Sequence, residues 1–290
     1  MGQVWKCSGV RWSGGGPELV WSGGRRSPLG RGRRVAFKAV EGGARECVGA
    51  RGNPCPVRAA VPARSTGARC EECARLDRAH SVAADTVADD PRPYHVYLAW
   101  FGPGMTKVGI TAVERGPARL LEQGAVCFSW LGAGPLMAAR RAEELLRAAL
   151  KVPDRIPYRD KRVVRSVLPG SAAERAAEIE SLHARALALA GWPEALVPEP
   201  CQVFDHVRVF GLAGIPAAVG EVAGLVPGAR VGGELVAAAG PDLHLATPSG
   251  VLVLDTRLLP GWELTAAGDA DGPGPALPVR EFTVPQDGLF

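Results

Sequence analysis

Short apolar runs separated by turn residues mark both ends of the chain. These runs are β-like, rich in Val, Leu and aromatic residues, and glycine clusters or Gly-Pro and Pro-Ser-Gly turns flank most of them. They lie at residues 10–12, 19–21, 35–40, 203–210, 231–238, 243–246 and 251–254. Short strands bounded by turn residues predict small β-modules at the two ends of the chain.

The middle of the chain has a different pattern, which predicts strands followed by helices. Residues 94–100 and 106–111 are rich in aromatic and β-branched side chains and flank a Phe-Gly-Pro-Gly turn, so they predict a β-hairpin. A proline at the start and a glycine after the end favour a short helix over 117–123. Two longer helices are predicted over 137–150 and 171–190, and the second opens with a Ser-x-x-Glu capping box.

These patterns predict an α+β chain with three folded parts. We expect a basic, cysteine-containing β-module over residues 1–85, an α/β domain over 91–196 and a small β-barrel over 200–267. Residues 268–290 are rich in Gly and Pro and are predicted to form a flexible tail.

Charge is unevenly distributed along the chain. The whole sequence has 34 Lys and Arg against 30 Asp and Glu, but residues 1–75 hold fourteen against five, and residues 201–290 hold four against ten. Clusters of Lys and Arg attract polyanions, so the basic front end suggests a partner that carries phosphates. A solvated arginine-rich surface is the alternative, and charge alone does not decide between them.

The sequence offers no membrane segment. No run of about 18 uncharged apolar residues occurs, and the first twenty residues lack the continuous apolar core of a secretory signal. The seven cysteines are therefore expected in a reducing cytoplasm, and we expect no membrane partner.

Four of the cysteines fall within 27 residues and suggest a structural zinc site. They are Cys47, Cys55, Cys70 and Cys73. The last two form a CxxC knuckle, whose thiolates can converge on one ion, and Zn²⁺ prefers four such ligands. The first two are eight positions apart, so His80 or Cys7 is an alternative ligand. Free thiols and a redox-active CxxC are the other interpretations.

The predicted hairpin and the helices after it resemble the GIY-YIG endonuclease superfamily. Val96-Tyr97 on the first strand and Lys107-Val108-Gly109 on the second are similar to the paired strands that name it. Arg119 on the next helix and Glu143 on the one after fit its order of Tyr, Gly, Arg and Glu. No clear counterpart of its late asparagine is present.

A second resemblance covers most of the chain. The segments beginning at Tyr97 (Tyr-Leu-Ala), Lys107 (Lys-Val-Gly-Ile-Thr) and Arg119 (Arg-Leu-Leu-Glu-Gln-Gly-Ala) resemble domain-of-unknown-function family 2797. The cysteine-bearing front and the β-rich rear are also similar to that family, which supplies no biochemical role.

The superfamily resemblance implies a catalytic role for each matched residue. Tyr97 would position or deprotonate the attacking water, and Arg119 would hold the scissile phosphate with its planar guanidinium. Glu143 would bind a single Mg²⁺, and Gly109 would let the backbone approach the substrate. Lys107 stands where the superfamily has tyrosine, and it would either bind phosphate or act as a base with a lowered pKa.

Several alternatives remain at these positions. Arg115 is an alternative to Arg119, and Glu144 to Glu143, because the helix phase is uncertain by one residue. Each matched residue also fits an ordinary structural role. Tyr97 can be a cross-strand aromatic, and Glu143 can pair with Arg147 on an exposed helix face.

The function predicted from these observations is metal-dependent phosphodiester hydrolysis of nucleic acid, with structural Zn²⁺ and catalytic Mg²⁺. One alternative is a zinc-containing nucleic-acid-binding protein that kept the fold without the chemistry. Another is a protein-interaction scaffold whose acidic β-domain binds a basic partner. No P-loop and no Gly-x-Ser-x-Gly motif occurs, which argues against an ATPase, a kinase or a serine hydrolase. The choice between DNA and RNA, the sequence preference and the oligomeric state stay open.

Overall fold

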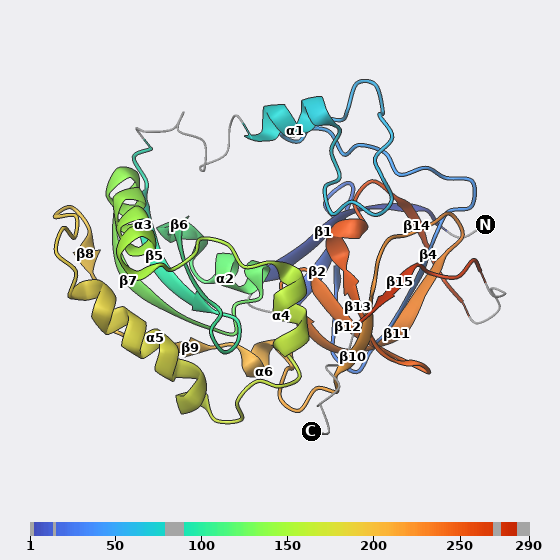
Figure 1. Ribbon diagram of the computed structural model, residues 1–290. Helices are drawn as coiled ribbons and strands as arrows, with labels where there is room; N and C mark the ends of the chain where they lie inside the picture. Colours follow the sequence, from blue (N-terminus) through green and yellow to red (C-terminus); the bar gives the residue numbers. More distant parts are fainter. Residues whose placement is uncertain (1–2, 14–15, 79–89, 269–273, 283–290) are drawn as a thin grey trace. The chain divides into compact units, whose positions relative to one another are not determined.

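The computed structural model describes residues 3–13, 16–78, 90–268 and 274–282, and it divides the chain into two compact units (Figure 1). The first unit, called the sheet unit, combines Met1–Asp77 with Pro216–Phe290. The second, called the hairpin unit, comprises Arg78–Ile215. The two β-rich ends, expected as separate modules, therefore fold together.

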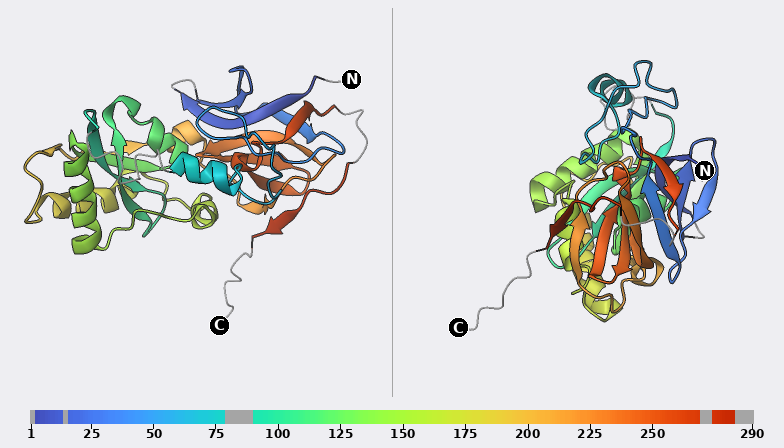
Figure 2. Two further views of the ribbon diagram at one scale, coloured as in Figure 1. Left: turned by 90° about the horizontal axis from the view of Figure 1, so that it is seen from above. Right: turned by 90° about the vertical axis from the view of Figure 1, so that its right-hand side faces the viewer.

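The sheet unit is built on ten strands drawn from both ends of the chain. They are β1 (Trp5–Ser13), β2 (Gly16–Trp21), β3 (Arg26–Pro28), β4 (Arg34–Ala39), β10 (Ala218–Val222), β11 (Arg230–Ala239), β12 (Asp242–Thr247), β13 (Gly250–Asp255), β14 (Glu263–Ala266) and β15 (Val279–Glu281). Their order is β15-β10-β13-β12-β11-β4-β14-β1-β2-β3, with β10 and β13 the one parallel pair along this path. Figure 2 shows the blue N-terminal strands beside the orange C-terminal ones.

This pairing corrects two expectations. The described strands follow an open path whose end strands β15 and β3 do not pair with each other, so the closed C-terminal barrel predicted over 200–267 is not formed by them. Residues 200–215 belong to the hairpin unit instead. Within the tail expected to be flexible, β15 pairs with β10, whereas residues 269–273 and 283–290 lie outside the described part.

The sheet unit contains one α-helix in the described residues, α1 (Glu71–Arg78), and a 3-10 turn at Thr256–Leu258. A long connection joins β4 to α1, and it contains two isolated β-bridges, Glu46 with Ala60 and Ala50 with Asn53. Arg45, which is 2% exposed, ties this segment to the sheet connections: its guanidinium donates to the carbonyls of Pro62 and Pro260 at 2.9 Å each.

The hairpin unit has a small antiparallel sheet covered by helices. Its strands are β5 (Pro93–Trp100), β6 (Thr106–Ala112), β7 (Cys127–Pro135), β8 (Val197–Pro198) and β9 (Phe204–Asp205), in the order β6-β5-β7-β8 with β9 also paired to β7. Its helices are η1 (Val113–Arg115), α2 (Ala118–Gln123), α3 (Leu136–Leu150), α4 (Tyr158–Val164), α5 (Ala172–Leu187) and α6 (Val207–Phe210). Both α3 and α5 pack against the sheet.

Most elements predicted for the hairpin unit are confirmed. The hairpin over 94–100 and 106–111 is β5 and β6, and α5 begins with the expected capping box between Ser171 and Glu174. The short helix α2 ends at Gly124, whose left-handed conformation (φ 70°) suits glycine. No helix within the described residues combines the length and apolarity needed to cross a bilayer.

The strand predicted over 203–210 is wrong. Residues 204–205 form β9, and the chain then turns into α6. The Asp205 carboxylate accepts a hydrogen bond from the Val207 amide at 2.8 Å, and Gly211 ends the helix in the left-handed region (φ 75°). These local hydrogen bonds outweigh the β-branched side chains that suggested a strand.

Candidate functional site

The hairpin β5–β6 places Tyr97, Lys107 and Gly109 on one side of the sheet. Tyr97 lies directly opposite Gly109, and Ala99 lies opposite Lys107. Opposite residues of an antiparallel pair share a face, and side chains alternate along each strand. All three residues therefore lie on the same face of the sheet.

That face opens into a cavity of about 790 Å³, called the hairpin cavity, which lies entirely within the hairpin unit. All five residues predicted from the sequence line it, and so do both alternates. They are Tyr97, Lys107, Gly109, Arg119 and Glu143, with Arg115 and Glu144. Strands β5 and β6, helices α2 and α3 and the turn η1 supply these side chains.

Gly109 makes room for the phenol ring of Tyr97. A Cβ built on Gly109 would lie 2.5 Å from Cζ and 3.0 Å from Cε2 of Tyr97, and closer still to the hydroxyl. Real Cβ atoms essentially never come within 3.0 Å of a heavy atom outside their own and the adjacent residues. The glycine was expected to admit substrate to the backbone, but the structure fills that space with the tyrosine ring.

Tyr97 is 2% exposed, and a neighbouring glutamine fixes its hydroxyl. The Gln123 side-chain amide donates to the phenol oxygen at 2.8 Å. Burial raises the pKa of Tyr97 above its ordinary value, while Gln123 and the positive charge of Arg119 act in the opposite direction. At neutral pH the phenol therefore keeps its proton and is available as a hydrogen-bond donor.

Lys107 is buried beside this ring. Its ammonium is 5.7 Å from the centre of the Tyr97 ring and donates to the carbonyl of Asp154 at 3.1 Å. Burial lowers the pKa of Lys107 to about 8, helped by the positive charge of Arg119 and opposed by Glu143. Its side chain therefore changes protonation near physiological pH, unlike an ordinary surface lysine.

Glu143 is half-buried in the same cavity, whereas Glu144 is exposed. Burial raises the pKa of Glu143, and the nearby positive charge of Lys107 opposes the rise. Among the described residues Glu143 belongs to no cluster of three or more metal-ligating side chains. It offers a single carboxylate, which suits an ion such as Mg²⁺ that keeps most of its water ligands.

The hairpin cavity is strongly cationic. Seven of its lining residues are basic, and three are acidic. The basic residues are Arg92, Lys107, Arg115, Arg119, Arg140, Arg147 and Arg155. Glu122, outside the cavity lining, accepts a hydrogen bond from Arg115 at 2.6 Å and lies 3.9 Å from Arg119. The surplus of positive charge favours an anionic ligand.

Three residues that the sequence analysis did not single out contribute to this site. Gln123 lies four positions after Arg119 on α2, and that spacing signals a shared helix face. Thr111 continues the alternation of Lys107 and Gly109 on β6; it lines the cavity with its buried hydroxyl oxygen unpartnered in the described structure. Asp154, in the connection after α3, has no sequence signal because neither helical nor strand periodicity applies there.

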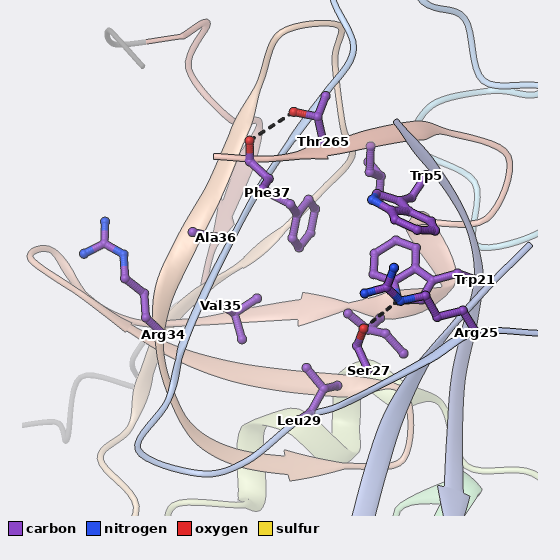
Figure 3. Close-up of a pocket in the computed structure, with 13 residues that line it drawn as sticks. Trp5, Trp21, Arg25, Ser27, Leu29, Arg34, Val35, Ala36, Phe37 and Thr265 are labelled. Atoms are coloured by element: carbon purple, nitrogen blue, oxygen red, sulfur yellow. Dashed lines mark hydrogen bonds between the residues drawn. The ribbon is translucent and has the colours of Figure 1, made fainter. Parts of the chain in front are cut away.

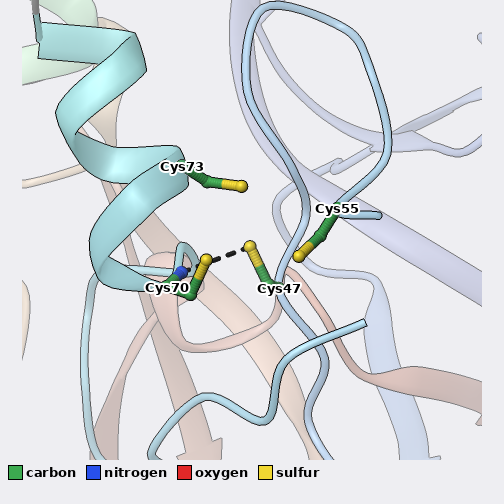
Figure 4. Close-up of side chains that lie close together, drawn as sticks. All are labelled: Cys47, Cys55, Cys70 and Cys73. Carbon is green, nitrogen blue, oxygen red and sulfur yellow. Dashed lines mark hydrogen bonds between the residues drawn. The ribbon is translucent and has the colours of Figure 1, made fainter. Parts of the chain in front are cut away.

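The sheet unit brings the four predicted cysteines together (Figure 4). Their sulfur atoms all lie within 4.8 Å of one another. Tetrahedral zinc with Zn–S bonds of about 2.3 Å places its sulfurs roughly 3.8 Å apart, so the cluster needs little movement to close on an ion. These four side chains can therefore hold a metal ion.

The backbone around the cluster already points donors at sulfur. The amides of Gly49 and Cys70 donate to Cys47 Sγ at 3.3 and 3.2 Å. Gly49 adopts φ 78°, and a Cβ there would lie 2.8 Å from the Cys55 nitrogen. Cys7 lies on β1 outside the cluster, and the alternate ligand His80 lies outside the described residues.

The fold and the two sites define a mixed α+β protein with a cationic cavity in one unit and a four-thiol cluster in the other. The family model described as "Protein of unknown function (DUF2797)" matches residues 32–264, and the chain belongs to that family. No curated protein and no solved structure matches the chain. These comparisons do not support the predicted resemblance to the GIY-YIG superfamily.

Proposed function

We propose that the hairpin unit hydrolyses phosphodiester bonds of nucleic acid with the help of a divalent metal ion. The observation that carries this proposal is the shared cavity of Tyr97, Lys107, Gly109, Arg119 and Glu143. These residues come from two strands and two helices spread over 47 positions, and each residue type has a role in phosphodiester hydrolysis.

The order of elements in the hairpin unit supports the same proposal. A hairpin, a short helix, a third strand beside the hairpin and a longer helix follow one another, with β5 central in the order β6-β5-β7. The arginine comes from the first of these helices and the glutamate from the second, as the resemblance implies.

The protonation states suggest how the residues divide the chemistry. The neutral amine of Lys107, accessible because its pKa is about 8, accepts a proton from the attacking water. The protonated hydroxyl of Tyr97 orients that water. Arg119 binds a non-bridging oxygen of the phosphate and stabilises its negative charge as the water oxygen bonds to phosphorus. The P–O bond to the leaving alcohol breaks, and the leaving oxygen takes a proton from solvent water.

Glu143 is the residue that would hold the metal ion. Its carboxylate is half-buried and its pKa is raised by burial, so a bound cation would favour the charged form. Mg²⁺ bound there would supply electrostatic stabilisation of the phosphate. A single protein carboxylate leaves the ion's other positions for water and phosphate oxygens.

Plasmid nicking tests the proposal. With Mg²⁺, the wild-type chain should nick supercoiled DNA or cleave a labelled RNA, and Glu143→Gln should abolish cleavage while keeping the fold. Glu144→Gln is the matched control, because this neighbour is exposed on the same helix, and it should cleave like wild type. Equal loss in both variants, or no loss in Glu143→Gln, would contradict the assigned metal ligand.

The surplus of basic residues favours the second candidate, a nucleic-acid-binding protein without cleavage activity. Such a protein would bind nucleic acid with an affinity that falls steeply with salt, because bound phosphates release counterions. Its affinity would survive Glu143→Gln, and no Mg²⁺-dependent product would form. The acidic docking domain of the scaffold hypothesis has less support, because the acidic C-terminal strands share one sheet with the basic N-terminal strands.

We also propose that the four-cysteine cluster binds structural zinc. Four sulfur ligands complete a tetrahedral site and leave no open position for a catalytic water. Three of the four cysteines, together with Val61, form the buried core of this segment, so the ion would supply cohesion that apolar side chains do not. Thiolate ligands need a reducing compartment, in agreement with the cytoplasmic location that we propose.

A further inference from the structure

A second cavity lies in the sheet unit, away from the cysteine cluster and formed by other residues than the hairpin cavity. Its volume is about 270 Å³, and strands β1, β2, β3, β4 and β14 line it. β3 and β4 are separated by three strands in the pairing order, so this end of the sheet curls to bring both to one cavity. We call it the tryptophan cavity.

Aromatic and aliphatic side chains form its walls. Figure 3 shows Trp5, Trp21 and Arg25 on one side, with Val35 and Phe37 across from them. The two indole rings are half-buried, their centres lie 6.3 Å apart, and their planes are inclined at 52°. Such walls match a flat, apolar ring better than a flexible or highly polar ligand.

The orientation of these rings is set by the protein itself. The Trp21 indole nitrogen donates to the Ser27 hydroxyl at 2.8 Å, which fixes the ring plane. The exposed guanidinium of Arg25 lies 4.5 Å from the centre of the Trp5 ring. A positive charge is therefore already stacked at the cavity, and it disfavours a cationic ligand such as a methylated lysine.

The charge at the cavity points to an anion, because its lining holds two basic residues, Arg25 and Arg34, and no acidic one. Residues 1–40 hold eight Lys and Arg against one Glu. Six of these basic residues are exposed: Arg11, Arg25, Arg26, Arg31, Arg33 and Arg34. They lie on β1, β3 and β4 and in the connections between strands, and Arg26 among them pairs with Glu18 at 3.3 Å.

We propose that the tryptophan cavity binds one unpaired base of a single-stranded nucleic acid, with Arg25 contacting the adjacent phosphate. Aromatic faces beside a basic surface are how proteins hold single strands with little sequence preference. A duplex keeps its bases stacked and paired, so it does not offer a free ring. The inference rests on the proposed nucleic-acid substrate and names its form: a strand with at least one unpaired nucleotide.

Binding of a labelled oligothymidine to the full-length Glu143→Gln chain tests the inference without cleavage and without added Mg²⁺. Trp21→Ala should raise Kd at least tenfold, because it removes the ring. Trp21→Phe should stay within about threefold of the parent, because it keeps an aromatic face although it also loses the bond to Ser27. Arg25→Gln should weaken binding and reduce its dependence on salt.

Trp192→Ala is the control, because this half-buried tryptophan lies in the hairpin unit and donates to the Leu196 carbonyl. It should bind like the parent, and thermal unfolding should show that every variant is folded. If Trp21→Ala fails to fold, Trp21→Phe and Arg25→Gln still test the inference.

Three results would overturn the inference. One is equal affinity of Trp21→Ala and Trp21→Phe. Another is an affinity for duplex, or for free thymidine monophosphate, that equals the affinity for the single strand. The third is binding to anionic phospholipid vesicles with none to the oligonucleotide. Because cleavage is absent from the assay, a failure of the proposed hydrolysis would leave this result unchanged, and the reverse also holds.

Discussion

Replacing Gly109 by alanine isolates the contact that organises the hairpin cavity. The added Cβ would lie 2.5 Å from the Tyr97 ring carbon Cζ, well inside the shortest contact that real Cβ atoms make. The clash is with an aromatic ring that is only 2% exposed and whose hydroxyl accepts a hydrogen bond from Gln123 at 2.8 Å. The ring therefore has to shift, and the shift separates its hydroxyl from the glutamine.

The cost follows from these two effects. Overpacking a close-packed site costs about 1–3 kcal/mol, and a buried amide that loses its partner costs about 1–3 kcal/mol more. Alanine in a strand regains about 0.5–1 kcal/mol relative to glycine. We expect Gly109→Ala to lower the free energy of unfolding by about 2–4 kcal/mol, which corresponds to a fall in Tm on the order of 10 °C.

Chemical and thermal unfolding followed by circular dichroism measures this loss. Gly232→Ala on β11 is the matched control: a Cβ there meets Val35 O at 3.7 Å, an ordinary contact, so its Tm should not fall. In a Tyr97→Leu background the clashing ring atoms are gone, and Gly109→Ala should then cost less than about 1 kcal/mol. An equal cost with and without the tyrosine ring would refute the reasoning.

Three further predictions concern metal, pH and the tyrosine. Protein purified without chelator should contain about one equivalent of zinc by elemental analysis. Cys70→Ser should lose the zinc and have a lower Tm. Cys201→Ser, at an exposed cysteine outside the cluster, should keep both the zinc and the Tm. The pKa of Lys107 is about 8 in the folded chain, below its ordinary value of 10.5, so the unfolded chain binds more protons between these two pH values. This lysine therefore makes the free energy of unfolding rise with pH across that window. Lys107→Met should remove the rise in a series of denaturation experiments at different pH. If the neutral amine is the base, the cleavage rate should also climb between pH 7 and 9, whereas a falling rate would show that the charged form acts. Tyr97→Phe should keep the fold but slow cleavage, because only the hydroxyl that accepts from Gln123 is lost.

Local patterns predicted the hairpin unit well. Aromatic and β-branched residues around a turn identified β5 and β6, and the capping box placed the start of α5 at the correct residue. Strands of the sheet unit were predicted at residues 10–12, 19–21, 35–40, 231–238, 243–246 and 251–254, and the structure confirms them. Their pairing was missed, because strands from the two ends of the chain pair across about 200 residues of sequence. A single sequence carries no signal for such a pairing: β4 would fit beside β2 as well as beside β11.

The candidate site was predictable to the extent that its residues match a motif or cluster along the sequence. The GIY-YIG resemblance singled out Tyr97, Lys107 and Gly109, and the density of the cysteines singled out the metal cluster. The choice between neighbours depended on the helix phase, which the structure supplies: α3 leaves Glu144 exposed and turns Glu143 inward. The tryptophan cavity had no signal, since Trp5 and Trp21 come together only when β1 pairs with β2.

Lys107, which stands where the GIY-YIG resemblance implies a tyrosine, decides how the proposed hydrolysis would work. A second phenol there would have an ordinary pKa near 10, and burial would raise that pKa further. Such a phenol would not lose its proton near pH 7. Burial has the opposite effect on an amine and lowers the pKa of Lys107 to about 8. The same burial keeps Tyr97 protonated and raises the pKa of Glu143. In the proposed mechanism one shared environment thus separates the hydrogen-bond donor from the base, and it makes the carboxylate dependent on a cation, which is the division of roles that hydrolysis would need.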